Sequence, residues 1–455
     1  MANSPDIIIC GAGIIGICCA YHLAVRHGLK RILLVDERSP LSLTSDKSSE
    51  CYRNWWPDQA MVFLMNRSID LMEELADQTG NAFHLNRRGY LYITEDERRA
   101  KDWLHLAQRI SKYGGGPLRI HNENKQQTLY QPSPVEGFDR ELSGADIILD
   151  PKLLRKNYPY ISTRVIAGLH VRRAGWFSAQ QLGMILLEQA RAYGVELVKA
   201  SITGINTRGG RVRSIELDNM HTVGTGAFIN AAGPLIPNVL RLLDVSPLPV
   251  VNELHLKAVI NDSLNIVPRD APLLIWSDPQ VLNWSEDESA FLADEADMSW
   301  LLDELPPGGH TRPEGPGNSQ SLLLLWQYRA MEKDAVWPIP VDMQYAEIVL
   351  RGLTSMLPGL RGYLDKLPRA VIDGGYYTHT PENRPLIGPL AVKGAFACGA
   401  FSGYGVMAAC GAGEILAAHL IGSSLPPIVD AFSPARYDDP AYMEKVRSWG
   451  ETGQL

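Results

Sequence analysis

The first forty residues carry apolar positions in a strand–helix–strand pattern. Ile7–Ile9 form a short apolar run, a stretch with helical spacing follows, and a second run occupies Ile32–Val35. Short apolar runs separated by a helical segment are typical of parallel strands buried on both faces of a sheet. The pattern therefore predicts a βαβ unit at the start of the chain.

The turn between the first strand and the helix has the form G-x-G-x-x-G, with Gly11, Gly13 and Gly16. The first glycine permits a tight turn, the second lets a pyrophosphate approach the backbone, and the third lets the helix pack on the strand. Asp36 stands 20 residues after Gly16, at the end of the second run, where a carboxylate accepts hydrogen bonds from ribose hydroxyls. These residues predict a dinucleotide site.

Helical and strand patterns alternate along the rest of the chain. The clearest helical stripe covers 59–79, and a second strand–helix–strand unit begins near Gly175. The strand–glycine turn–helix pattern of the N-terminus occurs again near the C-terminus. It consists of a small-residue strand at 395–400, a glycine-rich turn and an apolar helix at 408–421. The two ends of the chain are therefore expected to meet at one nucleotide.

Three other segments lack this regularity. Residues 117–150 show no period, residues 308–318 are rich in Gly and Pro, and both are predicted to be loops. Residues 285–304 carry many acidic side chains and are predicted to form a solvated surface insertion.

Composition narrows the class of protein. The 455 residues have a net charge of −8 and no long basic run, so a nucleic-acid partner is not expected. No apolar stretch is long enough for a transmembrane helix, and no secretory signal is expected. The six cysteines show neither C-x-x-C spacing nor a His/Cys cluster, which favours a cytoplasmic protein without disulfides or a metal site.

Several blocks together resemble the D-amino acid oxidase-like flavoproteins, in particular the branch with glycine oxidase, sarcosine oxidase and dimethylglycine dehydrogenase. The blocks are GAGIIG with Asp36, the serine-bearing loop 45–53, FINAAG at 228–233, the segment 377–388 and AFSGYGVM at 400–407. Their order and spacing cover almost the whole chain, apart from 117–150 and the acidic insertion. The resemblance implies FAD as the cofactor.

The resemblance also implies an α/β protein, α+β overall. A Rossmann-like FAD-binding domain would be interleaved with a substrate domain built on a large, mostly antiparallel sheet. The expected FAD-binding segments are 1–85, 175–245 and 346–455, and the expected substrate segments are 86–174 and 246–345.

Matching positions assign the cofactor contacts by resemblance. Loop residues would wrap the phosphates and flavin, small residues would let FAD pass, and the C-terminal glycine turn would lie beside the ring. The implied cofactor-binding residues are Gly11, Gly13, Ile14, Gly16, Asp36, Glu37, Ser45, Ser48, Ser49, Ile202, Ala232, Gly233, Gly403, Tyr404, Gly405, Val406 and Met407.

Two departures from the family pattern affect function. Covalent members carry a flavin-binding cysteine two residues before the position of Tyr377, where this chain has Gly375, so non-covalent FAD is expected. Relatives have a carboxylate-binding lysine where this chain has Met407, which weakens the case for simple α-amino acids. Arg53 is then the candidate for a substrate carboxylate.

The remaining candidates line the expected ring end. Lys257, in a largely apolar strand, and Tyr377 are the candidate catalytic residues, the lysine as a positive charge that assists oxygen reduction. Besides Arg53 and Met407, Trp55 and His379 are candidate substrate contacts. Four of these residues also have a purely structural interpretation: Lys257 as a surface lysine, Trp55 as a core tryptophan, His379 as a hydrogen-bonding histidine, and Arg53 as a phosphate-binding or surface arginine.

The resemblance implies oxidation of a C–N bond in a secondary amine or an amino or imino acid, by hydride transfer to flavin N5 that leaves an imine. Electrons would pass to oxygen or to an electron carrier. One alternative is a 2-hydroxy acid or glycerol-phosphate dehydrogenase. A second, of another class, is a non-catalytic flavoprotein that assists assembly of respiratory complexes.

Overall fold

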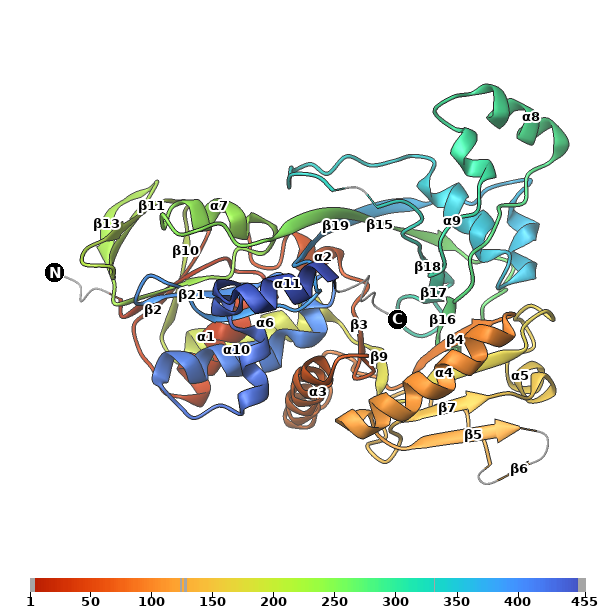
Figure 1. The fold of residues 1–455 in the computed structure, drawn as a ribbon, viewed down its shortest axis with the longest axis horizontal. Coiled ribbons are helices and arrows are strands. Elements are labelled where there is room, and N and C mark those ends of the chain that lie inside the picture. Colours follow the sequence, from red (N-terminus) through yellow and green to blue (C-terminus); the bar gives the residue numbers. More distant parts are fainter. Residues whose placement is uncertain (1–4, 123–124, 127–128, 331, 449–455) are drawn as a thin grey trace.

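The protein consists of two lobes that lie side by side, each built on its own β-sheet (Figure 1). We describe it from a computed structural model, in which residues 5–122, 125–126, 129–330 and 332–448 are placed. No helix among these residues is long and apolar enough to cross a membrane.

The smaller lobe has a six-stranded sheet in which only the last strand is antiparallel. The strand order is β10 (Val195–Lys199), β2 (Ile32–Asp36), β1 (Ile7–Cys10), β14 (Ala227–Asn230), β21 (Ala395–Gly399) and β20 (Leu386–Pro389). The predicted βαβ unit is confirmed as β1, α1 (Ile14–Tyr21) and β2. As predicted, segments from both ends of the chain join this sheet.

Two layers cover the six-stranded sheet. One face packs against α1, α6 (Ala179–Ala192) and α10 (Gly405–Ile421). The other face packs against α7 (Ile236–Arg241) and a three-stranded sheet of β11 (Ile202–Thr207), β12 (Val212–Leu217) and β13 (Met220–Gly224). Both faces of the parallel strands are therefore buried, as their continuous apolar runs require.

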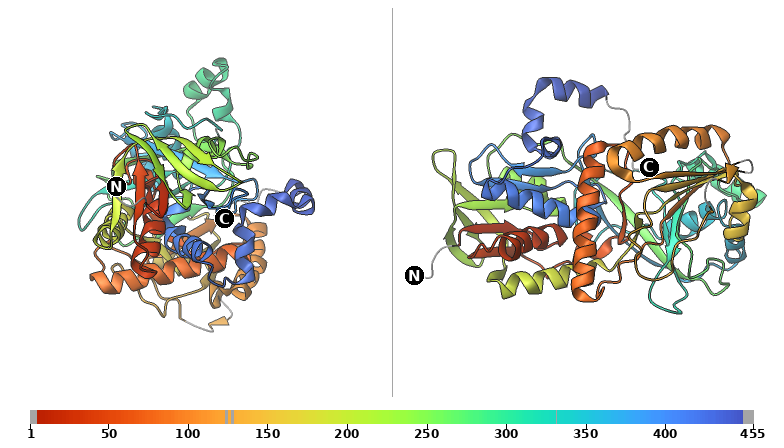
Figure 2. Two further views of the ribbon diagram at one scale, coloured as in Figure 1. Left: turned by 90° about the vertical axis from the view of Figure 1, so that its left-hand side faces the viewer. Right: turned by 90° about the horizontal axis from the view of Figure 1, so that it is seen from below.

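The long helix α3 (Gln59–Thr79) runs along the junction of the lobes (Figure 2, right). It has the bounds that its apolar stripe predicts. Asp58 caps it by accepting a hydrogen bond from the backbone N–H of Met61, and Gly80 ends it in the left-handed conformation. Its buried face packs against α10, so the helix is fixed to the smaller lobe.

The larger lobe has a ten-stranded, mostly antiparallel sheet. Its order is β19 (Val371–His379), β15 (Val251–Asn261), β18 (Ser321–Leu325), β17 (His310–Pro313), β16 (Leu273–Trp276), β4 (Tyr90–Thr94), β8 (Ala167–Val171), β7 (Ala145–Ile148), β5 (Leu118–Asn122) and β6 (Lys125–Gln126). Helices α4 (Glu97–Ile110) and α5 (Pro151–Asn157) pack against the strands at the β4–β7 end. The combination of a Rossmann-like sheet and a large, mostly antiparallel sheet confirms the predicted fold class.

Two segments predicted to be loops contain strands. Residues 117–150 include β5 and β7, whose apolar alternation is masked by charged side chains paired inside the sheet: Asp146 accepts from both Arg119 and His121 at 2.7 Å. Residues 308–318 include β17, which forms a strand because it pairs with β16 and β18.

The boundary predicted at residue 346 does not follow the sheets. Helix α9 (Tyr345–Leu353) packs in the core of the larger lobe, and β19 is an edge strand of the larger sheet. The chain returns to the smaller lobe only with β20. The final helix, α11 (Pro440–Ser448), follows there.

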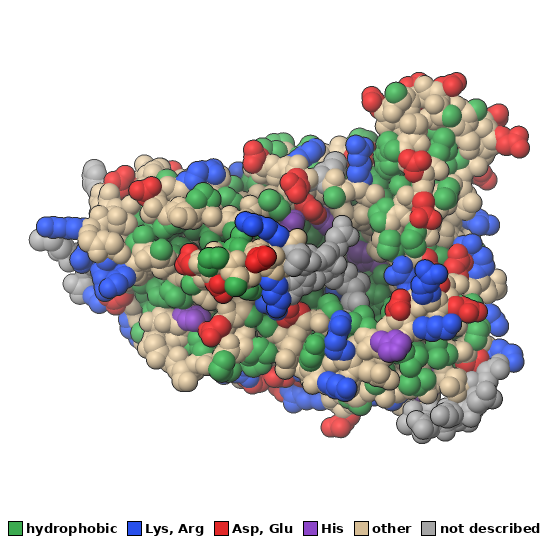
Figure 3. Space-filling model, viewed as in Figure 1, with side chains coloured by type: hydrophobic (Ala, Val, Ile, Leu, Met, Phe, Trp, Pro, Cys, Tyr) green, Lys and Arg blue, Asp and Glu red, His purple; other side chains and the backbone are tan. Residues whose placement is uncertain are grey.

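The acidic segment 285–304 projects from the larger lobe and contains α8 (Glu286–Asp294) (Figure 1). Acidic side chains are exposed over this projection (Figure 3). Ser285 and Glu288 form a capping box at its start.

Candidate active site

A cavity of about 430 Å³ extends from the C-terminal edge of the six-stranded sheet to strands β15 and β19 of the larger lobe. At the carboxyl ends of parallel strands, loops and helix N-termini leave room for a ligand. The lining includes Asp36 at one end and Tyr377 at the other. The cavity therefore connects the predicted nucleotide turn with the predicted ring end.

The glycine turn after β1 leaves no space for side chains. Gly11 has φ +104°, and a Cβ there would lie 2.5 Å from the carbonyl oxygen of Ala231. A Cβ on Gly16 would overlap the carbonyl oxygen of Gly11. The turn thus presents bare backbone and the N-terminus of α1 to the cavity, as a pyrophosphate requires.

Asp36 holds this turn in place. Its carboxylate accepts hydrogen bonds from the backbone N–H groups of Ala12, at 2.7 Å, and Arg38, at 2.8 Å. The side chain also lines the cavity. Since a carboxylate can accept about four hydrogen bonds, acceptor capacity remains for the predicted ribose contact.

The loop after β2 covers the phosphate end of the cavity. It contains α2 (Thr44–Lys47). The hydroxyl of Ser45 accepts a hydrogen bond from the backbone N–H of Ile14, at 3.0 Å. Further along, the carbonyl of Ser48 accepts from the ammonium of Lys257 at 3.0 Å. The loop is therefore fixed to the glycine turn on one side and to the larger lobe on the other.

Most predicted cofactor residues line the cavity. They are Gly11, Gly13, Ile14, Asp36, Glu37, Ser45, Ser48, Ser49, Ile202, Ala232, Gly233, Gly403, Gly405 and Val406. Gly16, Tyr404 and Met407 do not line it. Tyr404 packs on Trp56 and donates to the carbonyl of Asn383 at 2.5 Å, and Met407 is buried in the core.

Lys257 and Tyr377 face the ring end of the cavity from neighbouring strands, β15 and β19. A side chain on Gly403, which has φ +80°, would overlap the Tyr377 ring. The glycine turn before α10 therefore lies directly against Tyr377. Burial lowers the pKa of Lys257 and raises that of Tyr377 to about 12.

Arg53, at the end of β3 (Cys51–Arg53), is a buried guanidinium that forms no ion pair with a described residue. It packs on the rings of Trp56, at 4.6 Å, and Tyr90, at 5.8 Å, and its Nε donates to the carbonyl of Trp55 at 3.2 Å. Its Nη2 and the hydroxyl of Tyr92 are both buried without a partner in the described structure. Unsatisfied buried donors are costly, so an acceptor that the described residues do not supply would stabilise both groups.

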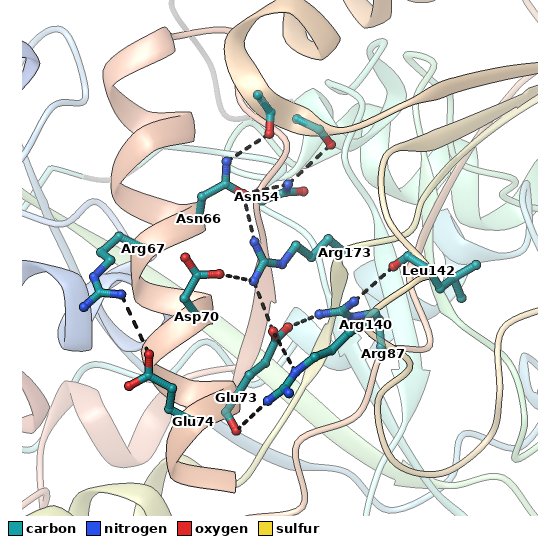
Figure 4. Close-up of polar contacts among 12 residues, drawn as sticks. Asn54, Asn66, Arg67, Asp70, Glu73, Glu74, Arg87, Arg140, Leu142 and Arg173 are labelled. Carbon is teal, nitrogen blue, oxygen red and sulfur yellow. Dashed lines mark hydrogen bonds and ion pairs between the residues drawn. The ribbon is translucent and has the colours of Figure 1, made fainter. Parts of the chain in front are cut away.

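A network of charged and amide groups fixes the segment that follows Arg53 (Figure 4). Asn54 donates through its side chain to Asn66 on α3 at 2.9 Å, and its backbone N–H donates to the carbonyl of Arg173. The Arg173 guanidinium in turn pairs with Asp70 and Glu73 of α3. Strand β3 also pairs with β9 (Ala174–Trp176). The position of Arg53 therefore depends on α3 and β9.

None of the predicted substrate contacts is among the residues that line the cavity. Arg53 and the neighbouring Tyr92 are buried next to its ring end, where the charge of Arg53 acts on Tyr377. Trp55 is fully buried, and Met407 packs in the core. His379 lies 3.4 Å from the carboxylate of Glu253, which raises its pKa.

Sequence reasoning did not single out Glu253, His255, Tyr92 or Arg312. His255 lines the cavity, and the buried Arg312 donates to the carbonyl of Ser49 at 2.7 Å. The alternation of side chains along β15 could have shown that Glu253 and His255 lie on the same face as Lys257. Residues 253, 255 and 257 share one face of that strand because side chains alternate with period two.

These features fit FAD. Bare backbone at Gly11 suits a pyrophosphate, and the lining reaches from this turn to Gly375 and Tyr377, as a dinucleotide requires. The part of the chain that the structure describes contains no group of three His, Cys, Asp or Glu side chains that could hold a metal ion.

Comparison with known proteins places the chain in a family. The family model described as "FAD dependent oxidoreductase" (DAO) matches residues 6–419, and the protein belongs to this family. The description of this family names FAD as the cofactor on which its members depend. This confirms the predicted resemblance and the predicted cofactor.

The chain is 22% identical to mitochondrial dimethylglycine dehydrogenase of Mus musculus over 452 residues, which cover 96% of this chain and 44% of that protein. It therefore spans less than half of that relative's length. Among solved structures, L-proline dehydrogenase from P. horikoshii has a TM-score of 0.72 at 17% identity, covering 96% of this chain and 99% of the other. Iminodiacetate oxidase from Chelativorans sp. BNC1 has a TM-score of 0.68 at 17% identity, covering 94% and 99%. These structures share the fold.

The cavity wall predicts how FAD is attached. Gly375 lines the cavity, and a Cβ there would lie 3.4 Å from Cα of Thr44, in ordinary contact. With no side chain at this position to form a thioether, acid precipitation of the holoenzyme is expected to release all the flavin into the supernatant. Absorbance of the supernatant and in-gel flavin fluorescence measure this. A fluorescent protein band after denaturing electrophoresis would contradict the prediction.

Proposed function

We propose that the protein oxidises a carboxylate-bearing secondary or tertiary amine, an N-substituted or cyclic amino acid, at the C–N bond. The observation that carries this proposal is the unpaired, buried guanidinium of Arg53. The named substrates of dimethylglycine dehydrogenase, L-proline dehydrogenase and iminodiacetate oxidase are compounds of this class, which supports the proposal.

Arg53 and Tyr92 would hold the carboxylate. The positive charge of Arg53 is close enough to Tyr377 and Tyr92 to act on the pKa values of both phenols. It also lies near His310, whose pKa burial lowers to about 4. An anion bound at Arg53 would therefore sit beside the ring end, where Tyr377 limits the position of the nitrogen substituents.

Bound FAD would supply the acceptor for the hydride that leaves the carbon next to the substrate nitrogen. The side chains of this site position the substrate, exclude water and neutralise its carboxylate. Charge-assisted hydrogen bonds from a buried guanidinium are directional, so they orient the bond to be oxidised.

An anaerobic panel of compounds tests this function. N-methyl amino acids, L-proline and iminodiacetate are compared with simple α-amino acids, amines without a carboxylate, 2-hydroxy acids and glycerol phosphate. We expect the flavin to bleach with members of the first group. Bleaching by a hydroxy acid and by no amine would favour the dehydrogenase alternative. No bleaching together with stable co-purification of a respiratory subunit would favour the assembly factor.

Lys257 gives a separate prediction about the electron acceptor. Its ammonium reaches the ring end and is bound to the carbonyl of Ser48, where a fixed positive charge would stabilise the charge that forms when oxygen is reduced. For Lys257→Met we expect reoxidation of the reduced enzyme by oxygen to slow about 100-fold, with anaerobic reduction nearly unchanged. Stopped-flow absorbance measures both rates. An unchanged reoxidation rate would remove this role.

A further inference from the structure

Three charged or polar side chains on β15 and β19 lie in close contact at the wall of the cavity. Glu253 lies between two histidines: one carboxylate oxygen is 3.2 Å from Nε2 of His255, and the other is 3.4 Å from Nε2 of His379. The ring of His255 stacks on Tyr377 with centroids 3.6 Å apart and planes at 11°. His255 and Tyr377 line the cavity, whereas Glu253 and His379 stand behind them.

We propose that His255 is the catalytic base that removes the ammonium proton of the bound amine, with Glu253 as its positioning residue. This inference rests on the proposed function, because an amine with a protonated nitrogen has no lone pair available to form an imine. One N–H bond of the substrate breaks and one N–H bond forms at Nδ1 of His255. The electron pair stays on the substrate nitrogen.

The hydrogen bond to Glu253 fixes the tautomer of His255. The two histidines hold the pKa of Glu253 far below its usual range, so its carboxylate is ionised and can only accept hydrogen bonds. Nε2 of His255 must therefore carry the proton, and Nδ1 is left as the acceptor. Nδ1 has no hydrogen-bond partner among the described residues, and it is not fully buried. It is therefore accessible to a bound molecule.

The surroundings of His255 suit a base. Burial lowers its pKa, so the ring is neutral at pH 7, while the nearby carboxylate stabilises the imidazolium after proton transfer. The titratable groups that face it are Glu253 and Lys257 on β15, Tyr377 and His379 on β19, and His310 on β17.

His310 is the competing candidate, and its environment opposes the role. Its Nδ1 donates to the carbonyl of Gly308 at 2.8 Å, which leaves Nε2 as an acceptor. However, the charged groups that act on it are Arg53 and Arg312, which disfavour the imidazolium, and burial lowers its pKa to about 4. His255 is hydrogen-bonded to the carboxylate of Glu253, which stabilises its imidazolium form, whereas the guanidinium groups near His310 destabilise that form.

The pH dependence of anaerobic flavin reduction tests the proposal in the holoenzyme, with sarcosine as the probe. In the wild type, the rate should rise through the pKa of His255 and then stay level, because the base must be neutral. In His255→Asn we expect a loss of about 100-fold at pH 7 that recovers toward pH 10, where sarcosine itself is deprotonated. The exposed His105→Asn on α4 is the matched control.

Glu253→Gln provides a second variant that keeps His255. We expect its pH profile to shift and its rate at pH 7 to fall about tenfold, because the amide no longer fixes the tautomer. Nitrogen NMR of histidine-labelled protein supplies a readout independent of turnover. The His255 signals, identified by their loss in His255→Asn, should show protonated Nε2 and bare Nδ1 in the wild type.

The outcomes separate this inference from the proposed function. If sarcosine and the other amines fail to reduce the wild-type flavin, the proposed function fails. If amines reduce the wild type and His255→Asn matches it at every pH, the base is overturned and the function stands. A tautomer with protonated Nδ1 would also overturn it.

Discussion

Replacing Arg53 by methionine is expected to weaken binding of a carboxylate-bearing amine by about 100- to 1,000-fold, or about 3–4 kcal/mol. Arg53 is 5% exposed, and its Nη2 has no partner in the described structure, so its positive charge is available to pair with an incoming carboxylate. Methionine keeps most of the volume that packs between Trp56 and Tyr90. The dissociation constant comes from the concentration dependence of anaerobic flavin reduction.

Two controls separate a carboxylate contact from a structural role of Arg53. An amine without a carboxylate should bind the variant and the wild type alike. Arg109→Met, on the exposed side of α4, should leave both substrates unaffected. Equal loss for both kinds of amine, or a lowered melting temperature with unchanged binding, would assign Arg53 to packing.

A single methyl group at Gly11 is expected to abolish FAD retention. The Cβ of Gly11→Ala would lie 2.5 Å from the carbonyl oxygen of Ala231, on a backbone with φ +104°. The turn must then move away from β14, and the N–H groups at the start of α1 lose their alignment. We expect purified protein with less than about one-tenth of the wild-type flavin, and an apparent Kd for FAD raised at least about 100-fold, a change of about 3 kcal/mol.

Gly194→Ala is the matched control for backbone strain. Gly194 has φ +101°, close to that of Gly11, but a Cβ there meets nothing within 4 Å. This variant should lose about 1–2 kcal/mol of stability and keep its FAD. Flavin absorbance per protein and added FAD in thermal melts measure the difference. If both alanine variants lost flavin equally, strain and not the close approach to Ala231 would be the cause.

Local sequence was sufficient for the nucleotide half of the molecule. The turn from Gly11 to Gly16 and the acid at 36 act through backbone geometry within one βαβ unit, and such geometry is encoded by neighbouring residues. Helix α3 agrees with the approximate bounds predicted for it, because its apolar stripe and its terminal glycine are local signals.

The sequence did not predict strands whose buried charged side chains form ion pairs with a neighbouring strand. Strands β5 and β7 carry Arg119, His121 and Asp146, which the sequence shows only as separate polar residues. Their pairing becomes visible only when the strands lie side by side, since a buried charge is tolerated when its partner is present. The same holds for Tyr404 and Met407, whose direction depends on how α10 packs against the core.

The sequence by itself determined the βαβ unit and, through the order of its blocks, the family and the cofactor. Tertiary structure alone decided which side chains meet at the candidate site. Arg53 lacks an acidic partner among the described residues because of how β3, α3 and β9 pack, and His255 meets Glu253 and Tyr377 because β15 pairs with β19 across more than a hundred residues. Hydrogen bonds and burial depend on distances in space, which spacing along the chain does not encode.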